Sequence, residues 1–173
     1  WRKGNVGILN AIGTGVADDK VVYSYVNKMI VYYLGEQPIL NQVETYLCHD
    51  KIQMDYVIEN ISKLVVKPAN ASGGYGIMIG PKAPQKEREE VIAKIKKNPR
   101  EFIAQPLEIL STAPTITKND IEPRHLDLRP FVLSGKSTYV TTGGLTRVAL
   151  RKGSTIVNSS QGGGSKDTLI VDI

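Results

Sequence analysis

The sequence predicts an α+β protein whose sheet is mainly antiparallel. Apolar residues recur at helical spacing in the first half of the 173-residue chain, whereas short β-rich runs separated by glycines fill the second half. A hydrophobic content of 41% is enough to bury a core, and 23% charged residues is ordinary for a globular protein. No apolar run in the sequence is long enough to cross a bilayer as a helix.

Three segments carry apolar residues three and four positions apart and are predicted helices: 18–34, 53–62 and 84–97. The first begins with acidic residues, which the helix dipole favours, and Gly35 ends it. The third ends at Asn98-Pro99, because the residue before a proline is disfavoured in a helix. Residues 36–48 are expected to be extended or irregular around Pro38.

Runs of apolar and β-branched residues predict strands at 64–68, 76–80, 101–106, 125–133, 137–144, 145–150, 154–160 and 168–173. The first two flank a glycine-rich loop and are expected to pair like a hairpin. Glycines are expected to form the turns, including Gly143-Gly144 between two of the later strands.

The most informative stretch is VVKPANASGGYG, residues 65–76, in which Lys67 ends an apolar strand. An ammonium group is costly there unless an anion meets it. The following Ser72-Gly73-Gly74-Tyr75-Gly76 offers backbone N–H groups unobstructed by Cβ atoms, which is typical of an anion nest. Taken alone, the stretch fits equally a glycine-rich hairpin beside a lysine that extends to solvent. It is neither a Walker loop nor a dinucleotide-binding fingerprint.

Two further stretches carry candidate chemistry. Strand alternation places His125, Asp127 and Arg129 on one face, which suits the floor of a polar cleft or, equally, an exposed edge with a weak ion pair. Arg147 lies in a strand-like run and could fork onto a carboxylate or phosphate. The Ser- and Gly-rich residues 158–166 could wrap a ligand, or act as a spacer.

Composition limits the remaining function classes. One cysteine, Cys48, excludes an internal disulfide and favours a reducing cytoplasm, and two histidines with one cysteine make no zinc signature. The formal net charge of +5 is compatible with nucleotides, nucleic acid or acidic small molecules. Nucleic-acid binding ranks last, because the notable cations lie beside glycine loops and inside strands.

Taken together, these stretches resemble the circularly permuted ATP-grasp family of type 2, bacterial proteins described as similar to glutathionylspermidine synthase. The matching stretches are GNVGILNAIGTGVADDK (4–20), VVKPANASGGYG (65–76), FIAQPLEILST (102–112), HLDLRPFVLSG (125–135), GGLTRVALRKGS (143–154) and VNSSQGGGSKD (157–167).

The resemblance implies an ATP-grasp fold, in which two α+β lobes hold ATP between antiparallel sheets. It divides this chain into a helical segment at 1–62, an ATP-lid lobe at 63–110 and a sheet lobe at 111–173. It also implies carboxylate–amine ligase chemistry, in which ATP phosphorylates a carboxylate and an amine attacks the acylphosphate. The substrates would be small-molecule or peptide carboxylates and amines, with no nucleic acid or membrane partner.

The resemblance assigns the ATP-binding residues as follows. Lys67 would contact the α and β phosphates under a lid formed by Ser72 to Gly76. Lys20 would be the second phosphate lysine, and Gln105 and Leu107 would lie at the adenine hinge.

The resemblance also assigns the catalytic and substrate residues. Asp127 would lie near the ribose or phosphates, while Arg129 or Arg147 would steady the acylphosphate or the transferring phosphoryl group. Residues Ser159, Ser160 and Gly162 would form a substrate-side loop. The magnesium ions of such a reaction would take Asp127 and Asn158 as ligands, and part of the metal site is expected upstream of Trp1.

The sequence thus predicts the ATP-binding portion of an ATP-dependent carboxylate–amine ligase with an unknown substrate. The alternative is a catalytically inactive module of the same fold that binds nucleotide or acts as a scaffold. The chain opens at Trp1 rather than Met and is expected to be part of a longer protein, inactive by itself. The sequence does not indicate an oligomeric state.

Overall fold

The computed structural model describes residues 1–173 except 118–119, 150, 156, 158–162 and 172–173. It confirms the α+β class, with two antiparallel sheets and flanking helices. The chain divides into two compact units, residues 1–107 and 108–173. The three-part division suggested by the family resemblance stays a prediction.

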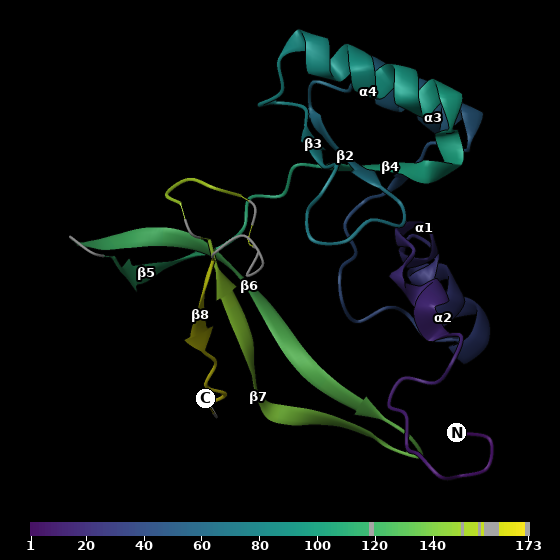
Figure 1. The fold of residues 1–173 in the computed structure, drawn as a ribbon, viewed down its shortest axis with the longest axis vertical. Coiled ribbons are helices and arrows are strands. Elements are labelled where there is room, and N and C mark those ends of the chain that lie inside the picture. Colours follow the sequence, from purple (N-terminus) through teal and green to yellow (C-terminus); the bar gives the residue numbers. More distant parts are fainter. Residues whose placement is uncertain (118–119, 150, 156, 158–162, 172–173) are drawn as a thin grey trace. The chain divides into compact units, whose positions relative to one another are not determined.

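The first unit contains the helices and one sheet (Figure 1). Its elements are η1 (Thr14–Asp18), α1 (Lys20–Tyr23), α2 (Val26–Leu34), β1 (Tyr46–Leu47), α3 (Lys51–Glu59), β2 (Leu64–Pro68), β3 (Met78–Ile79), α4 (Gln85–Lys97), η2 (Pro99–Glu101) and β4 (Phe102–Pro106). The sheet has the order β1-β4-β2-β3, and every pair is antiparallel. The predicted pairing of the strands that flank the glycine-rich loop is confirmed as β2 with β3.

The two faces of this sheet pack against different elements. Leu64 and Val66 of β2 and Ala104 of β4 belong to the larger core cluster, which includes Val57 of α3 and Ile95 of α4. Figure 1 shows α3 and α4 together on that side of the strands. Alternation along the strands therefore turns the intervening residues toward the opposite face.

The opposite face carries a smaller cluster. Ile103 of β4 packs there with Val21 of α1, Leu47 of β1 and Ala69, which follows β2. Lys67 is paired with Ile103 across the β2–β4 ladder, so its side chain leaves the sheet on the same side as α1. The strand pattern thus places a lysine beside the N-terminal helix.

The helix predicted at 18–34 is wrong as a single element. It is divided into α1 and α2 at Ser24, whose hydroxyl donates to the carbonyl of Val21 at 2.7 Å and so competes with helix continuation. Gly35 does end α2, with φ at 67°. None of the residues of α2 is buried, contrary to the apolar face expected there.

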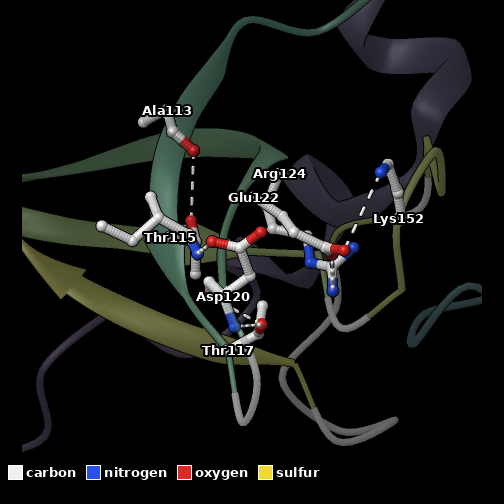
Figure 2. Close-up of polar contacts among 8 residues, drawn as sticks. Ala113, Thr115, Thr117, Asp120, Glu122, Arg124 and Lys152 are labelled. Atoms are coloured by element: carbon white, nitrogen blue, oxygen red, sulfur yellow. Dashed lines mark hydrogen bonds and ion pairs between the residues drawn. The ribbon is translucent and has the colours of Figure 1, made fainter.

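The second unit is a sheet in sequential order, β5-β6-β7-β8. Its strands are β5 (Thr112–Ile116), β6 (Ile121–Ser134), β7 (Thr138–Val148) and β8 (Gly164–Asp167). In Figure 1, β6 and β7 form a long twisted ribbon. Thr117 and Asp120 close the β5–β6 connection, where the Thr117 hydroxyl donates to the Asp120 carbonyl at 2.7 Å (Figure 2).

Several predicted strands of this unit need correction. The runs predicted at 137–144 and 145–150 are joined in one strand, β7, over residues 138–148, because Gly143-Gly144 is not a turn. Gly144 lies opposite Pro130, and a Cβ atom there would approach the Arg129 carbonyl oxygen to 2.9 Å, so close backbone approach explains this glycine.

The C-terminal strands also differ from the sequence prediction. The described residues of 154–160 and 168–173 are not strands, whereas β8 lies within the Ser- and Gly-rich stretch and pairs with β7. Hydrogen bonding along the edge of β7 outweighs the weak β propensity of this segment. The structure also adds β1 and β5, which the sequence did not predict.

Gly80, directly after β3, is expected to be intolerant of substitution. A Cβ atom at this position would lie 1.9 Å from the Ile61 carbonyl oxygen and 2.5 Å from that of Leu64. Gly80→Ala should therefore lower the free energy of unfolding by about 3 kcal/mol, measured by urea denaturation. Gly15→Ala is the control, since nothing lies within 4 Å of its added Cβ atom. Equal stability of the two variants would contradict the packing described here.

Candidate functional site

The candidate site in the first unit begins with Lys67. Its Nζ donates to Oε1 of Gln105 at 2.6 Å, and Gln105 Nε2 donates to the Thr45 hydroxyl at 2.9 Å. Gln105 is buried, with 8% of its surface exposed. A neutral amide, fixed at its other end by Thr45, therefore orients a half-buried ammonium group.

Lys20 is the first residue of α1, and its side chain contacts the segment that follows β2. Its Nζ donates to the carbonyl oxygens of Ala71 at 2.5 Å and Ala69 at 3.4 Å, and its backbone N–H also donates to Ala69. The preceding Asp19 caps α1 by accepting from the Val21 N–H and forms an ion pair with Arg100 at 2.5 Å. The start of α1 is thus fixed from two sides.

The electrostatics of the two lysines are unusual. Burial lowers the pKa of Lys67, and the positive charge of Lys20 lowers it further. Burial also lowers the pKa of Lys20, although nearby Asp19 raises it. Within the described part of the chain, neither ammonium group forms an ion pair with a carboxylate; their hydrogen-bond acceptors are an amide and backbone carbonyls. Two cations that repel each other in a half-buried space are suited to bind an anion.

The glycine-rich residues after Lys67 form a turn that only glycine adopts readily. Gly73, Gly74 and Gly76 have φ values of 70°, 79° and 71°. A Cβ atom on Gly76 would approach Cγ of Pro68 to 2.9 Å, so this glycine also allows the turn to fold against the end of β2. The turn follows the strand that holds Lys67 after three residues, 69–71.

The predicted adenine-hinge residues lie at the end of β4. Gln105 is paired with Val65 in the β2–β4 ladder, and Leu107 follows the strand and is half-buried. The adenine-hinge role of Gln105 stays a prediction, and its side chain makes a contact that the sequence did not reveal, since its Oε1 accepts from Lys67. Thr45 was also missed, because only the register of distant strands brings it to Gln105.

The second unit contains a separate cluster around Asp127. Arg147 lies directly opposite Asp127 in the β6–β7 ladder, and its Nε donates to the two carboxylate oxygens at 2.9 and 3.2 Å while its Nη2 donates to Oδ2. Arg129 Nε lies 3.8 Å from Oδ2 of Asp127. Two arginines on adjacent strands thus share one carboxylate.

Burial and hydrogen bonding distinguish the two arginines. The hydrogen bond from Arg147 lowers the pKa of Asp127, and the same bond raises the pKa of Arg147. The side chain of Arg147 is 16% exposed and that of Arg129 is 53% exposed. Arg147 is therefore a fixed donor, whereas Arg129 can turn toward a ligand. His125 was predicted to share a strand face with Asp127 and Arg129. Its Nδ1 lies 2.7 Å from the carbonyl oxygen of Leu110.

The magnesium prediction has little support within the described residues. No group of three His, Cys, Asp or Glu side chains among them could hold a metal ion. Asp127, a predicted ligand, contacts Arg147 and Arg129 in this structure. Four other predicted site residues lie outside the described part of the chain: Asn158, Ser159, Ser160 and Gly162.

Comparison with known proteins identifies the family. The sequence profile described as circularly permuted ATP-grasp type 2 matches residues 1–149. The chain belongs to the circularly permuted ATP-grasp type 2 family. This confirms the resemblance drawn from the six sequence stretches, and the two antiparallel sheets with flanking helices are those of an ATP-grasp-like fragment.

Members of several bacterial groups are similar to this ATP-grasp chain. A protein of Synechocystis sp. is 55% identical over 172 residues, which cover 99% of this chain and 36% of that protein. A Mycobacterium tuberculosis protein is 53% identical over 171 residues, covering 98% of this chain and 31% of its own length. A Frankia casuarinae protein named "Putative glutamate--cysteine ligase 2-2" is 53% identical over 169 residues, covering 98% of this chain and 20% of its own length.

The chain therefore spans between 20% and 36% of the length of these relatives. The Frankia name belongs to a protein of which one fifth is matched. In the described part of the ATP-grasp chain, no helix has the length and apolar character needed to cross a membrane.

Asp127→Asn is expected to destabilise the second unit, because it leaves the largely buried Arg147 without its counter-charge. The free energy of unfolding at neutral pH should fall by about 1–3 kcal/mol, measured by urea denaturation. Since the folded pKa of Asp127 is lowered, its stabilisation is complete above the ordinary value of 3.8 and is lost as pH falls through the folded pKa. The difference in the free energy of unfolding between the wild-type protein and Asp127→Asn should therefore narrow only in strong acid.

Asp167→Asn provides the matched control, because Asp167 is an exposed residue of β8 in the same unit. It should change the free energy of unfolding by less than about 0.5 kcal/mol. An Asp127→Asn protein as stable as this control would show that the Arg147 contact contributes nothing.

Proposed function

We propose that this chain is the ATP-binding portion of an ATP-dependent carboxylate–amine ligase. The observation that carries the proposal is a pair of half-buried lysines, neither paired with a carboxylate in the described residues. Lys67 lies in the strand before the glycine-rich turn, and Lys20 donates to the segment that joins that strand to the turn. A polyphosphate supplies the negative charge that such a space lacks. Membership of the ATP-grasp family supports ATP as its source.

The residues of the first unit are proposed to hold the phosphates. Lys67 contacts the α and β phosphates, and Gln105 keeps its ammonium group in place. Lys20 exchanges its carbonyl acceptors at Ala69 and Ala71 for phosphate oxygens. Residues 72–76 close over the phosphates, with Gln105 and Leu107 beside the base. Phosphate oxygens are charged acceptors, so the hydrogen bonds of the lysines to ATP are stronger than those to neutral carbonyl groups.

The proposed reaction joins a carboxylate to an amine. A carboxylate oxygen attacks the γ-phosphorus, the bond to the β–γ bridging oxygen breaks, and ADP leaves. The amine then attacks the acyl carbon, the C–O bond to phosphate breaks, and the amine proton is lost to solvent or a base. The protein stabilises the negative charge that develops on the transferred group.

The residues of the second unit are proposed to act on the substrate side. Arg129, exposed and loosely paired, steadies the transferred phosphoryl group or the acylphosphate, and Asp127 keeps Arg147 oriented for the same purpose. Ser159, Ser160 and Gly162 form the substrate loop in this proposal. Magnesium, with Asp127 and Asn158 as ligands, stays a prediction, because Asp127 contacts Arg147 and Arg129 in the described residues.

The substrate class is a small-molecule or peptide carboxylate and an amine. The name of the Frankia relative supports ligase chemistry in this family, without fixing the substrate of this chain. A cytoplasmic location is part of the proposal, which the presence of a single cysteine, Cys48, favours.

A second candidate function is a module that binds nucleotide without turnover. The observation in its favour is that Asp127, a predicted metal ligand, contacts Arg147 and Arg129. Release of ADP that depends on both a carboxylate and an amine, measured on the longer protein, would exclude this candidate. Amide formation by residues 1–173 alone would contradict the prediction that this piece is inactive by itself.

Lys67→Met should weaken ATP binding to this chain by about 10- to 100-fold, because a charge-assisted contact to phosphate is lost. Isothermal titration calorimetry with ATP and magnesium measures the dissociation constant. Lys63→Met is the control, since Lys63 is a surface lysine close in sequence that donates to Asn60 Oδ1 at 3.4 Å. Equal affinities of the two variants would refute the role of Lys67.

A further inference from the structure

The hydrogen bonds that begin at Lys67 form a chain with a single direction. Lys67 Nζ donates to Oε1 of Gln105 at 2.6 Å, and Nε2 of Gln105 donates to the Thr45 hydroxyl oxygen at 2.9 Å. That hydroxyl donates in turn to the Val43 carbonyl oxygen at 3.0 Å. Each group along the chain therefore donates toward the segment that precedes β1.

Strand register brings these side chains together from distant parts of the sequence. Val65 lies opposite Gln105 in the β2–β4 ladder, and Lys67 is two residues further along β2, so the side chains of Lys67 and Gln105 leave the sheet on the same face. The other edge of β4 pairs with β1, which brings Thr45, the residue before β1, beside Gln105. Three separate segments thus meet at one buried amide.

The donors and acceptors of the chain determine which way the Gln105 amide faces. An ammonium group only donates, so Lys67 requires the amide oxygen. The hydroxyl of Thr45 has one hydrogen, which the Val43 carbonyl oxygen accepts, so the hydroxyl oxygen faces Gln105 as an acceptor. A reversed amide would set donor against donor at Lys67 and oxygen against oxygen at Thr45. Thr45 therefore selects the end of the amide that faces Lys67.

The acceptor at the end of the chain is itself held in place. The Val43 N–H donates to the Tyr23 hydroxyl at 3.1 Å, and Tyr23 is the last residue of α1. The same helix begins with Lys20, the second lysine of the candidate site. The polar chain from Lys67 is thus connected through α1 to the other ammonium group.

A fixed amide has a consequence for ligand binding. The lysine side chain is flexible, and holding it in one conformation before a ligand arrives lowers the entropic cost of binding. An ammonium group has three N–H donors, so the bond from Lys67 to Gln105 leaves two of them for an anion. Because Gln105 is buried, water is a poor replacement for Thr45 as the acceptor of its amide nitrogen.

We propose that Thr45 is a positioning residue of the proposed ATP site. Its hydroxyl fixes the orientation of the Gln105 amide, and the amide oxygen holds the Lys67 ammonium group in place for the phosphates. Thr45 acts through these two residues and not by touching ATP. The effect on ATP affinity rests on the proposed function, whereas the orientation of the amide does not.

Nuclear Overhauser effects measure the amide orientation in the wild-type chain without nucleotide. The side-chain amide protons of Gln105 should show stronger cross-peaks to the Thr45 methyl group than to the ε-methylene protons of Lys67. They should also exchange with water at least about tenfold more slowly than those of Gln85, which is exposed. Stronger cross-peaks to Lys67 would show the reversed amide and overturn the proposal.

Thr45→Val keeps the shape of the side chain and removes the hydroxyl. The exchange of the Gln105 amide protons should become about fivefold faster or more, and calorimetry should show ATP binding weakened about three- to tenfold. Thr45→Ser keeps the hydroxyl and should restore both values to within about twofold of the wild type. Failure of Thr45→Ser to restore them would assign the effect to the lost methyl group and refute the positioning role. Should Thr45→Val not fold, the wild-type cross-peaks and Thr45→Ser decide.

Thr115→Val is the matched control in the second unit. The Thr115 hydroxyl donates to the Ala113 carbonyl oxygen at 3.1 Å, the same local bond that Thr45 makes (Figure 2). Its loss should leave Gln105 exchange and ATP affinity unchanged. An unchanged affinity in Thr45→Val but not in Lys67→Met would overturn the positioning role alone. An unchanged affinity in both would overturn the proposed ATP site itself.

Discussion

The hydrogen bond between Lys67 and the buried amide of Gln105 is the contact around which the candidate site of the first unit is built. An ammonium group held by a neutral acceptor loses hydration without gaining a counter-charge, and burial accordingly lowers its pKa. Lys20 adds a second positive charge to the same space. Burying two lysines without a carboxylate partner among the described residues does not by itself stabilise the folded unit. An anion would supply the missing counter-charge, which is why we propose that the lysine pair is a phosphate site.

The fold serves this site through strand alternation. Residues of β2 that face α3 and α4 build the main core, and the residues between them turn Lys67 toward α1. The same strand therefore stabilises the unit and presents the charged group. Asp19 caps the N-terminus of α1 and forms an ion pair with Arg100, and so it fixes the helix whose first residue is Lys20.

The sequence predicted the elements that have strong local signals. The apolar run of β2, the return strand β3 and the charged helix α4 follow from composition and periodicity. It missed β5, whose central Pro114 argues against a strand, and β8, whose Gly-Ser sequence has little β propensity. These strands form because neighbouring strand edges supply hydrogen bonds, which a local pattern does not show.

The sequence indicated the residues of the candidate site but did not predict which of them contact each other. Lys20, Lys67, Asp127 and Arg147 were all selected from the sequence. Their partners depend on strand register: Gln105 reaches Lys67 across the β2–β4 ladder, and Arg147 meets Asp127 only because β7 runs unbroken through Gly143-Gly144.

Proton uptake on ATP binding tests the central claim most directly. A polyphosphate beside Lys67 and Lys20 raises pKa values that burial has lowered below the ordinary 10.5. Calorimetry at about pH 9–10, in buffers of different ionisation enthalpy, measures the protons taken up on binding. The account predicts net uptake by this chain and a smaller uptake by Lys67→Met. Binding of ATP without any proton uptake across this pH range would show that the nucleotide does not meet these two lysines.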